Sequence, residues 1–242
     1  MSSYNTFAQF YDHLTENVDY KVRSNYISDF FSEYGNGGRK VLDLACGTGS
    51  ITLNLARQGY DVISIDLSEE MLITAKGKCP ESIFIKADMS DFALPEKVDF
   101  CVCSLDAVNH LTDFEQVRDC FDCVSQALNQ NGLFVFDVNT LYKHREVLAD
   151  NTFVYDEDDF FLSWDNHYIE NDIVEIFLDF FVFNGKNYDR FSESFKEKAY
   201  PAEQLTNALK NNFEIIGVYD ELTLDPPKDD SERLYFVCKK VK

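Results

Sequence analysis

The residues from Val41 to Ser50 carry the strongest chemical signal in this chain. A short apolar segment contains the acidic Asp43 near its end, and the chain then passes through Gly47 and Gly49. Glycines permit a sharp turn and a close approach of a ligand to the backbone. A carboxylate beside such a turn repels a pyrophosphate and attracts an ammonium or a sulfonium group. The pattern therefore indicates a site for a small ligand that carries positive charge.

A dinucleotide site is the main alternative for a glycine turn of this kind. Dinucleotide sites use the spacing G-x-G-x-x-G and bind a phosphate at the N-terminus of the following helix. Here Thr52 occupies the third glycine position, and Asp43 opposes a pyrophosphate. Both residues disfavour a nucleotide-dependent oxidoreductase. S-adenosyl-L-methionine, which carries an ammonium and a sulfonium, suits the acid better.

The segment from Val41 to Ser50 resembles motif I of the class I S-adenosylmethionine-dependent methyltransferases. Asp66, at the end of the next apolar segment, matches the acid that binds the ribose in that family. The resemblance covers residues 38–140 with specific motifs. A looser match over residues 4–12 looks like the capping segment of small-molecule methyltransferases. The resemblance implies a Rossmann-like sheet of seven strands and S-adenosyl-L-methionine as cofactor.

The resemblance also implies which residues bind the cofactor. Asp43 and the turn 45–49 hold the methionine part, and Asp66 accepts hydrogen bonds from both ribose hydroxyls. Ala45 stands where the family often has glycine, a departure that adds only a methyl group. The full implied set is Asp43, Ala45, Cys46, Gly47, Thr48, Gly49, Asp66, Leu67, Asp88, Met89, Ser104 and Leu105.

The resemblance assigns the adenine of the cofactor to the ends of the second and third strands. Asp88 accepts a hydrogen bond from the exocyclic amine, while Leu67 and Met89 enclose the ring. Taken alone, each of these acids also fits a purely solubilising role at the end of a strand. Their joint position beside a glycine turn favours the cofactor site.

Methyl transfer from a sulfonium is an in-line displacement, in which well-aligned partners account for roughly 7 kcal/mol or more of the barrier. A neutral amine then needs no strong base, whereas an oxygen acceptor of high pKa needs one. The catalytic candidates are His110, after the fourth strand, and Tyr11, whose counterpart in relatives reaches over the donor methyl. Both residues also fit a purely structural role.

The acceptor pocket is expected after the fifth strand and in the segment that follows it. Asn139 and Tyr142 follow that strand, together with His144 as a further candidate, and Trp164 contributes from the aromatic segment. The acceptor is expected to be a small molecule, which the sequence does not identify. A regulatory module that binds S-adenosyl-L-methionine without turnover is the alternative outside enzymes.

The elements that must position these residues alternate between apolar strands and helical patterns. Such alternation implies an α/β, doubly wound, mainly parallel sheet with right-handed crossovers. The patterns predict helices over 5–15, 20–34, 49–58, 68–78, 113–128 and 201–210, and strands over 40–45, 61–66, 82–87, 98–103, 133–138, 213–222 and 233–238. By the resemblance, the last strand is antiparallel. Ligands in such sheets bind at the carboxyl ends of the strands.

Between residues 151 and 198 the pattern changes to aromatic-rich segments separated by hairpin signals at 170–172 and 184–187. We expect a small antiparallel β insert here, which contributes to the acceptor site as a lid. The methyltransferase core then comprises residues 1–150 and 199–242.

Composition excludes several partners. The 242 residues carry a formal net charge of -21, which opposes binding to nucleic acid or to an anionic membrane surface. No signal peptide pattern and no run of 18 apolar residues occurs in the sequence, so we expect a cytoplasmic protein. The oligomeric state stays open.

Seven cysteines form an odd set, and most of them sit among apolar residues. Buried thiols are the expected outcome. The pair Cys120 and Cys123 has C-x-x-C spacing, but it falls within a predicted helix and has no second close pair. We therefore expect no metal site.

Overall fold

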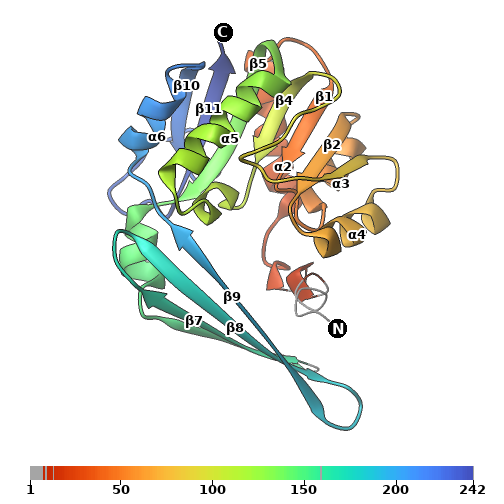
Figure 1. Ribbon diagram of the computed structural model, residues 1–242, viewed down its shortest axis with the longest axis vertical. Helices are drawn as coiled ribbons and strands as arrows, with labels where there is room; N and C mark the ends of the chain where they lie inside the picture. The colour runs from red at the N-terminus through yellow and green to blue at the C-terminus, as the bar shows by residue number, and fades with distance from the viewer. Residues whose placement is uncertain (1–7, 9, 13, 159, 242) are drawn as a thin grey trace.

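The computed structural model describes residues 8, 10–12, 14–158 and 160–241. Its main sheet has seven strands in the order β10-β11-β5-β4-β1-β2-β3 (Figure 1). The strands are β1 (Lys40–Leu44), β2 (Asp61–Asp66), β3 (Ile83–Lys86), β4 (Val98–Cys103), β5 (Leu128–Asn139), β10 (Phe213–Asp220) and β11 (Arg233–Lys240). Strands β1 to β5 pair in parallel, whereas β11 runs antiparallel to β5 and β10. The predicted fold class is confirmed.

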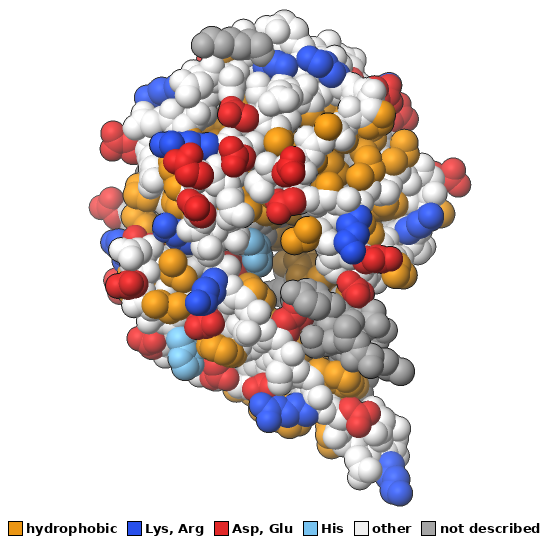
Figure 2. Space-filling model, viewed as in Figure 1, with side chains coloured by type: hydrophobic (Ala, Val, Ile, Leu, Met, Phe, Trp, Pro, Cys, Tyr) orange, Lys and Arg blue, Asp and Glu red, His pale blue; other side chains and the backbone are white. Residues whose placement is uncertain are grey.

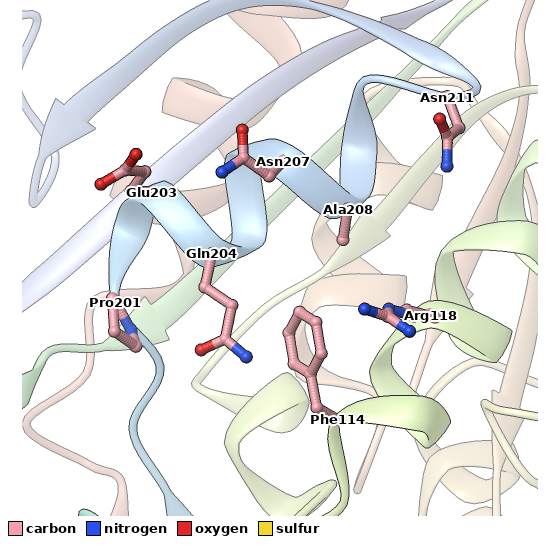
Figure 3. Close-up of a pocket in the computed structure, with 8 residues that line it drawn as sticks. All are labelled: Phe114, Arg118, Pro201, Glu203, Gln204, Asn207, Ala208 and Asn211. Carbon is pink, nitrogen blue, oxygen red and sulfur yellow. The ribbon is translucent and has the colours of Figure 1, made fainter.

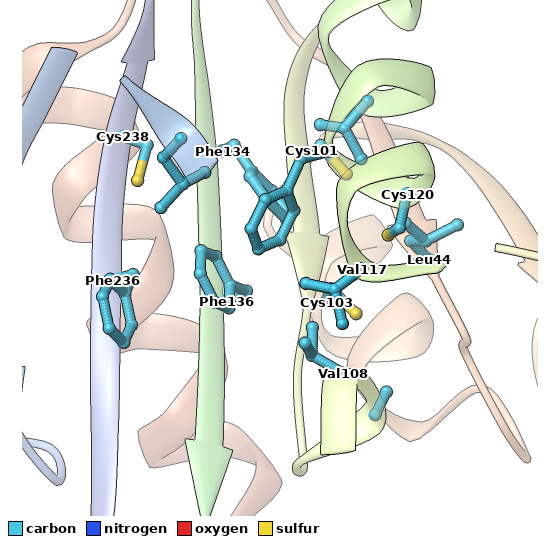
Figure 4. Packing of buried hydrophobic residues seen from close by; sticks show 14 of the residues in the cluster. Leu44, Cys101, Cys103, Val108, Val117, Cys120, Phe134, Phe136, Phe236 and Cys238 are labelled. Atoms are coloured by element: carbon cyan, nitrogen blue, oxygen red, sulfur yellow. The ribbon is translucent and has the colours of Figure 1, made fainter. Parts of the chain in front are cut away.

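Helices cover both faces of this sheet. They are α2 (Tyr20–Tyr34), α3 (Ser50–Arg57), α4 (Glu69–Lys78), α5 (Phe114–Ala127) and α6 (Ala202–Leu209). Successive strand residues point to opposite faces, so Val41 packs in the cluster of α2 and α3, and Leu42 packs in that of α5 and α6. In the second cluster the rings of Phe134, Phe136 and Phe236 stack across β5 and β11 (Figure 4).

The predicted helix over 5–15 is described only in part. Residues 8, 10–12 and 14 are helical, whereas residues 5–7, 9 and 13 lie outside the described part of the chain.

Asp19 caps the N-terminus of α2, because its carboxylate accepts a hydrogen bond from the Val22 backbone N–H. The predicted α2 boundaries are confirmed.

The segment after β5 forms a second, antiparallel sheet, hereafter the small sheet. Its strands, in spatial order, are β6 (Thr152–Asp156), β7 (Phe160–Tyr168), β8 (Ile173–Phe183) and β9 (Tyr188–Lys198). One face is apolar, and Leu162, Ile176 and Leu178 pack there in a cluster that also contacts Phe10 of the N-terminal segment. The β8–β9 hairpin extends far from the main sheet (Figure 1).

Three local elements differ from the sequence-based expectations. Strand β5 begins at Leu128 instead of 133, because Leu128 pairs with Val98 across a bulge in the register. A Cβ at Gly132 would lie 2.7 Å from the Asp99 carbonyl oxygen, so the glycine permits the close approach of the two strands there. The 3-10 helix η1 (Ala107–His110) and the π-helix η2 (Lys143–Leu148) were not expected.

All seven cysteines are free, and six of them are buried, in line with the expected packing role. Within the described residues, no helix is both long and apolar enough to cross a membrane.

Candidate active site

The glycine turn between β1 and α3 adopts a conformation that leaves room beside its backbone. Ala45, Gly47 and Gly49 all have positive φ, at 56°, 53° and 78°. A Cβ at Gly49 would lie 2.8 Å from the Cβ of Ala75, so this glycine permits the close packing of α4. A Cβ at Gly47 would meet no described protein atom within 4 Å. The backbone of Gly47 therefore faces open space at the carboxyl edge of the sheet.

Asp43 lies beneath this turn and is only 2% exposed. Its carboxylate accepts a hydrogen bond from the Thr52 hydroxyl, and the same hydroxyl lies 2.9 Å from the Ser64 hydroxyl. Burial raises the pKa of Asp43 to about 7, although the bonds from Thr52 oppose the shift. Thr52, which stands at the third glycine position of a dinucleotide motif, is thus the hydrogen-bond partner of Asp43.

Asp66 connects the end of β2 to the glycine turn. Its two carboxylate oxygens accept backbone hydrogen bonds from Gly47 and Ser68, each at 2.8 Å. Burial raises the pKa of Asp66, and these two bonds partly offset the effect. Each oxygen keeps a lone pair for a ligand. The next side chain, Leu67, is 65% exposed and presents an apolar surface beside this acid.

At the end of β3, the Asp88 carboxylate accepts hydrogen bonds from the Ser90 N–H and hydroxyl, at 2.8 and 2.7 Å. Met89 packs partly buried against the core. Cys46, inside the turn, is buried, and burial raises the pKa of its thiol far above the usual value. The burial of Cys46 agrees with a packing role inside the turn.

The N-terminal segment lies over the glycine turn. The Thr48 hydroxyl donates to Asp12 at 2.6 Å, and the Lys78 ammonium donates to Asp12 and Thr48. Tyr11 is half-buried beside this anchor. Burial, followed by the charges of neighbouring ionisable groups that include Asp106 and Asp66, raises the pKa of Tyr11 well above its usual value. The Tyr11 hydroxyl therefore stays protonated at neutral pH.

The loop after β4 is ordered by Asp137, a fully buried acid on β5. Its carboxylate accepts hydrogen bonds from the Ser104 hydroxyl and from the backbone N–H groups of Leu105 and Asp106, at 2.7 to 2.8 Å. Arg233 donates to Asp137 and Asp106 from β11. Burial alone would raise the pKa of Asp106, but the Arg233 guanidinium lowers it to about 2.

Sequence analysis missed Asp137 and Arg233. The available signal was a single charged residue inside the apolar run 133–138, which is costly unless the charge is paired. Ser104 and Leu105, which were expected to touch the cofactor directly, are positioned by this acid. Leu105 and Asp106 both have positive φ, and the bonds to Asp137 hold them there.

His110 lies at the end of η1, where the small sheet meets the main sheet. Its ring packs 5.1 Å from that of Phe195, and its Nε2 lies 3.9 Å from Glu197 Oε1. Asp106, His110 and Glu197 bring their ligand atoms within 4.8 Å of one another. This cluster is hereafter called the acidic corner. The sequence around residue 197 gave no signal for this cluster. Glu197 lies at the end of β9, far along the chain from Asp106 and His110.

The expected acceptor-pocket residues fall at three separate places. Asn139 is buried beside Glu197, to which its Nδ2 donates at 3.4 Å. Tyr142 is partly exposed just before η2. Trp164 lies within the small sheet, where its indole N–H donates to Asn166 and its ring meets that of Phe153 edge-on. Of the three, only Asn139 contacts the acidic corner in the described contacts.

Figure 2 shows a hollow between the main body and the small sheet, beside the residues drawn in grey. A separate groove of about 590 Å³ lies between α5 and α6 (Figure 3). The groove is lined by Phe114, Arg118, Pro201, Glu203, Gln204, Asn207, Ala208 and Asn211. None of these residues belongs to the predicted site, so the groove is not a candidate for the chemistry.

Comparisons with known proteins point to one family. Residues 41–132 match the family model described as "Methyltransferase domain". The putative methyltransferase YqeM of Bacillus subtilis is 35% identical over 99% of this chain and 98% of its own length. A crystal structure of an S-adenosylmethionine-dependent methyltransferase from Clostridium acetobutylicum is 34% identical with a TM-score of 0.90, over the whole of both chains.

A more distant relative carries a more specific name. An N,N-dimethyltransferase of dTDP-3-amino-3,4,6-trideoxy-alpha-D-glucopyranose from Streptomyces venezuelae is 27% identical over 54% of this chain and 56% of its own length. The glycine turn, the acids at the strand ends, the antiparallel β11 and the full-length relatives all agree. The chain belongs to the class I S-adenosylmethionine-dependent methyltransferases.

Proposed function

We propose that this enzyme transfers a methyl group from S-adenosyl-L-methionine to a nitrogen or oxygen atom of a small-molecule acceptor. The core in this proposal comprises residues 1–150 and 199–242, and residues 151–198 form the lid of the acceptor site. The observation that carries the proposal is the pairing of Gly47 with Asp66. Gly47 has positive φ and open space where a Cβ would lie, and its N–H binds the acid that faces the same space.

The residues at the carboxyl edge fit the cofactor in their chemistry. The turn 45–49 and Asp43 would hold the methionine part, Asp66 would accept the ribose hydroxyls, and Leu67 would cover one face of the adenine. Asp88, Met89, Ser104 and Leu105 would complete the adenine side. The cofactor supplies the methyl group on a sulfonium, which makes it electrophilic without a metal ion or a redox step.

The chain's own residues supply position and shelter. Asp12 fastens the N-terminal segment to Thr48 and Lys78, which closes the donor side and excludes water. The Tyr11 hydroxyl, whose pKa burial raises, would orient the reacting groups as a hydrogen-bond donor and not act as a base. Alignment of the two reactants then provides most of the rate.

A small acceptor fits the surroundings better than a polymer does. The small sheet presents aromatic side chains such as Phe195 beside His110. The formal net charge of -21 opposes nucleic acid as a partner. The Streptomyces venezuelae relative is named for methylation of an amino sugar nucleotide, which supports a small acceptor here as well.

Two measurements test the proposal. Calorimetry should give micromolar binding of S-adenosyl-L-methionine and of its demethylated product, and no binding of NAD. Incubation with methyl-labelled cofactor and a metabolite extract should then label at least one small molecule, and fragmentation mass spectrometry identifies the methylated atom. Binding of NAD alone contradicts the cofactor site. Cofactor binding with no labelled product from a broad extract contradicts the enzyme and supports a binding module.

A further inference from the structure

Glu197 is the buried member of the acidic corner, beside the partly buried Asp106 and the exposed His110. Glu197 is 4% exposed. Its two oxygens lie 3.9 Å from His110 Nε2 and 3.7 Å from His144 Nε2, distances too long for hydrogen bonds. Asn139 Nδ2, at 3.4 Å, is the one hydrogen-bond donor to this carboxylate among the described contacts. Burying a carboxylate with a single hydrogen bond is costly, so this group is suited to accept further hydrogen bonds from a ligand.

His144 adds an independent indication. It is fully buried, and its Nδ1 lies 3.0 Å from the carbonyl oxygen of Asp172. A carbonyl only accepts, so Nδ1 carries the proton, and in the neutral ring Nε2 is an acceptor. That Nε2 has no hydrogen-bond partner among the described residues, and it faces Glu197. The Oδ1 of Asn139 is likewise buried without a described partner.

The charges around the corner favour a cation at Glu197. Within the described residues no Lys or Arg lies within 4 Å of its carboxylate, and the two imidazoles there are cationic only when they are protonated. Arg233 lies on the other side, where it pairs with Asp106, Asp137 and Glu221, and Lys143 acts on Asp106 from η2. The cations of the region are therefore engaged with Asp106 and its neighbours, and Glu197 is the acid that a ligand can neutralise.

Spacing bears on whether the corner takes an organic cation or a metal ion. Three acceptors around a tetrahedral ammonium, each at about 2.9 Å, lie roughly 4.7 Å apart. Ligands of a tetrahedral zinc ion, each at about 2.1 Å, lie only about 3.4 Å apart. The ligand atoms of the corner lie within 4.8 Å of one another, which admits an ammonium, and the His110–Glu197 pair, at 3.9 Å, falls between the two spacings. A titration with zinc is therefore one arm of the test below, whereas a histidine ligand does not suit calcium or magnesium.

We propose that the acidic corner binds the protonated amino group of the methyl acceptor, so that the substrates of this enzyme are small amines. This inference rests on the proposed function and specifies its acceptor atom. His110 and Asp106 form the partly exposed mouth of the corner and Glu197 forms its floor, with His144 and Asn139 beside Glu197. An ammonium brings three N–H donors to these acceptors, whereas a hydroxyl brings one.

Glu197 also provides the place for the proton that must leave. One proton passes from the bound ammonium to the Glu197 carboxylate, which leaves a neutral amine with a free lone pair. That lone pair forms the new N–C bond while the C–S bond breaks and its electron pair stays on sulfur. The product is a methylated ammonium, and the proton on Glu197 returns to solvent when the product leaves.

A binding experiment tests the subsite without any turnover. The histidine ring signals of the protein, saturated with S-adenosylhomocysteine, are followed by NMR during titration with methylammonium chloride. We expect saturable shifts of the signals of His110 and His144. The Glu197→Gln variant keeps the shape and the bond to Asn139 and should bind methylammonium at least tenfold more weakly. The matched control is Glu175→Gln, on the neighbouring strand β8 and beside Lys196, which should bind like the parent.

The remaining arms separate the alternatives. Tetramethylammonium, which has the charge but no N–H donor, should cause no shift, and equal binding of both ions overturns the donor argument. Micromolar binding of zinc that depends on Glu197 and His110 also overturns the proposal in favour of a metal site. Absence of any shift with methylammonium overturns it as well. If an extract then yields a methylated oxygen, the proposed function stands and only the amine subsite fails.

Discussion

The main sheet and the small sheet hold their polar residues in different ways. In the main sheet the acids at the strand ends are bound within one sheet edge, as Asp66 is by the backbone N–H groups of Ser68, two residues away, and of Gly47 in the neighbouring turn. The small sheet contributes Glu197 through its last strand, and the partners of Glu197 come from η1, β5 and η2. The first candidate site lies along one edge of one sheet, whereas the second forms only where two sheets meet.

This comparison suggests a division of labour that variants can test. Changes in the small sheet should affect acceptor chemistry more than cofactor retention, and changes at the strand ends of the main sheet should do the reverse.

Replacing residues 151–198 by a short Gly-Ser linker should have the largest effect. Methyl transfer should fall at least about 100-fold, because the acceptor loses its orienting groups. Binding of S-adenosylhomocysteine by calorimetry should stay near that of the parent. Shortening the hairpin tip at 184–187 is the matched control, and it should leave both unchanged. Retained transfer after removal of the whole segment contradicts the role of the small sheet as a lid.

Asp137→Ala tests the support of the loop after β4. The variant leaves the buried Arg233 guanidinium without one of its acids and removes three other hydrogen bonds. We expect a loss of about 3–5 kcal/mol in the free energy of unfolding, measured by urea titration. The exposed Asp119→Ala on α5 should change it by less than about 0.5 kcal/mol. A loss below about 1 kcal/mol for Asp137→Ala would show that Asp137 is not the residue that holds the loop after β4.

Asp66→Ala tests the ribose site. Hydrogen bonds to a charged acceptor contribute about 1.5–3 kcal/mol each, so the affinity for S-adenosylhomocysteine should fall at least tenfold in calorimetry. Asp61→Ala, at the opposite end of the same strand, is the matched control and should bind normally. A folded Asp66→Ala variant that binds within twofold of the parent shows that Asp66 does not hold the ribose.

Asp43 gives the smallest effect, and pH reveals it. Its pKa in the free protein is about 7, because burial disfavours the charged form. If the ammonium of the cofactor lies near Asp43, binding favours the ionised acid, and affinity should fall by up to about tenfold between pH 8 and pH 6. Asp43→Asn should make the affinity nearly independent of pH over this range. An equal pH dependence in both proteins places the ammonium elsewhere.

The same group affects stability with a defined sign. A folded-state pKa above the unfolded value means that Asp43 contributes stability at low pH, and this contribution is lost as pH rises through about 7. The melting temperature of the ligand-free Asp43→Asn variant should therefore exceed that of the parent at pH 8, and the difference should be much smaller at pH 5. The reverse order would show that Asp43 is ionised and well paired without ligand.

Much of the cofactor edge was predictable because it depends on local backbone. The turn 45–49 has its shape from glycines that accept positive φ, and Asp66 is bound by residues that the strand and turn bring close. The alternating apolar pattern determined the strands and their faces, so the sheet class followed from sequence alone. The start of β5 was misjudged because the β4–β5 register shifts over residues 129–132, where Asn131 has positive φ, and the pairing resumes on both sides of that segment.

The proposed acceptor side depends on pairs that the sequence does not place together. Arg233 and Asp137 are 96 residues apart, and they meet because β11 inserts antiparallel beside β5. Glu197 reaches His110 and His144 because the small sheet returns to the main sheet at the end of β9. The sequence therefore determined the cofactor turn and the fold class through local conformation and periodicity. Only the tertiary structure decided which buried charges face one another, because their distances are set by packing between sheets.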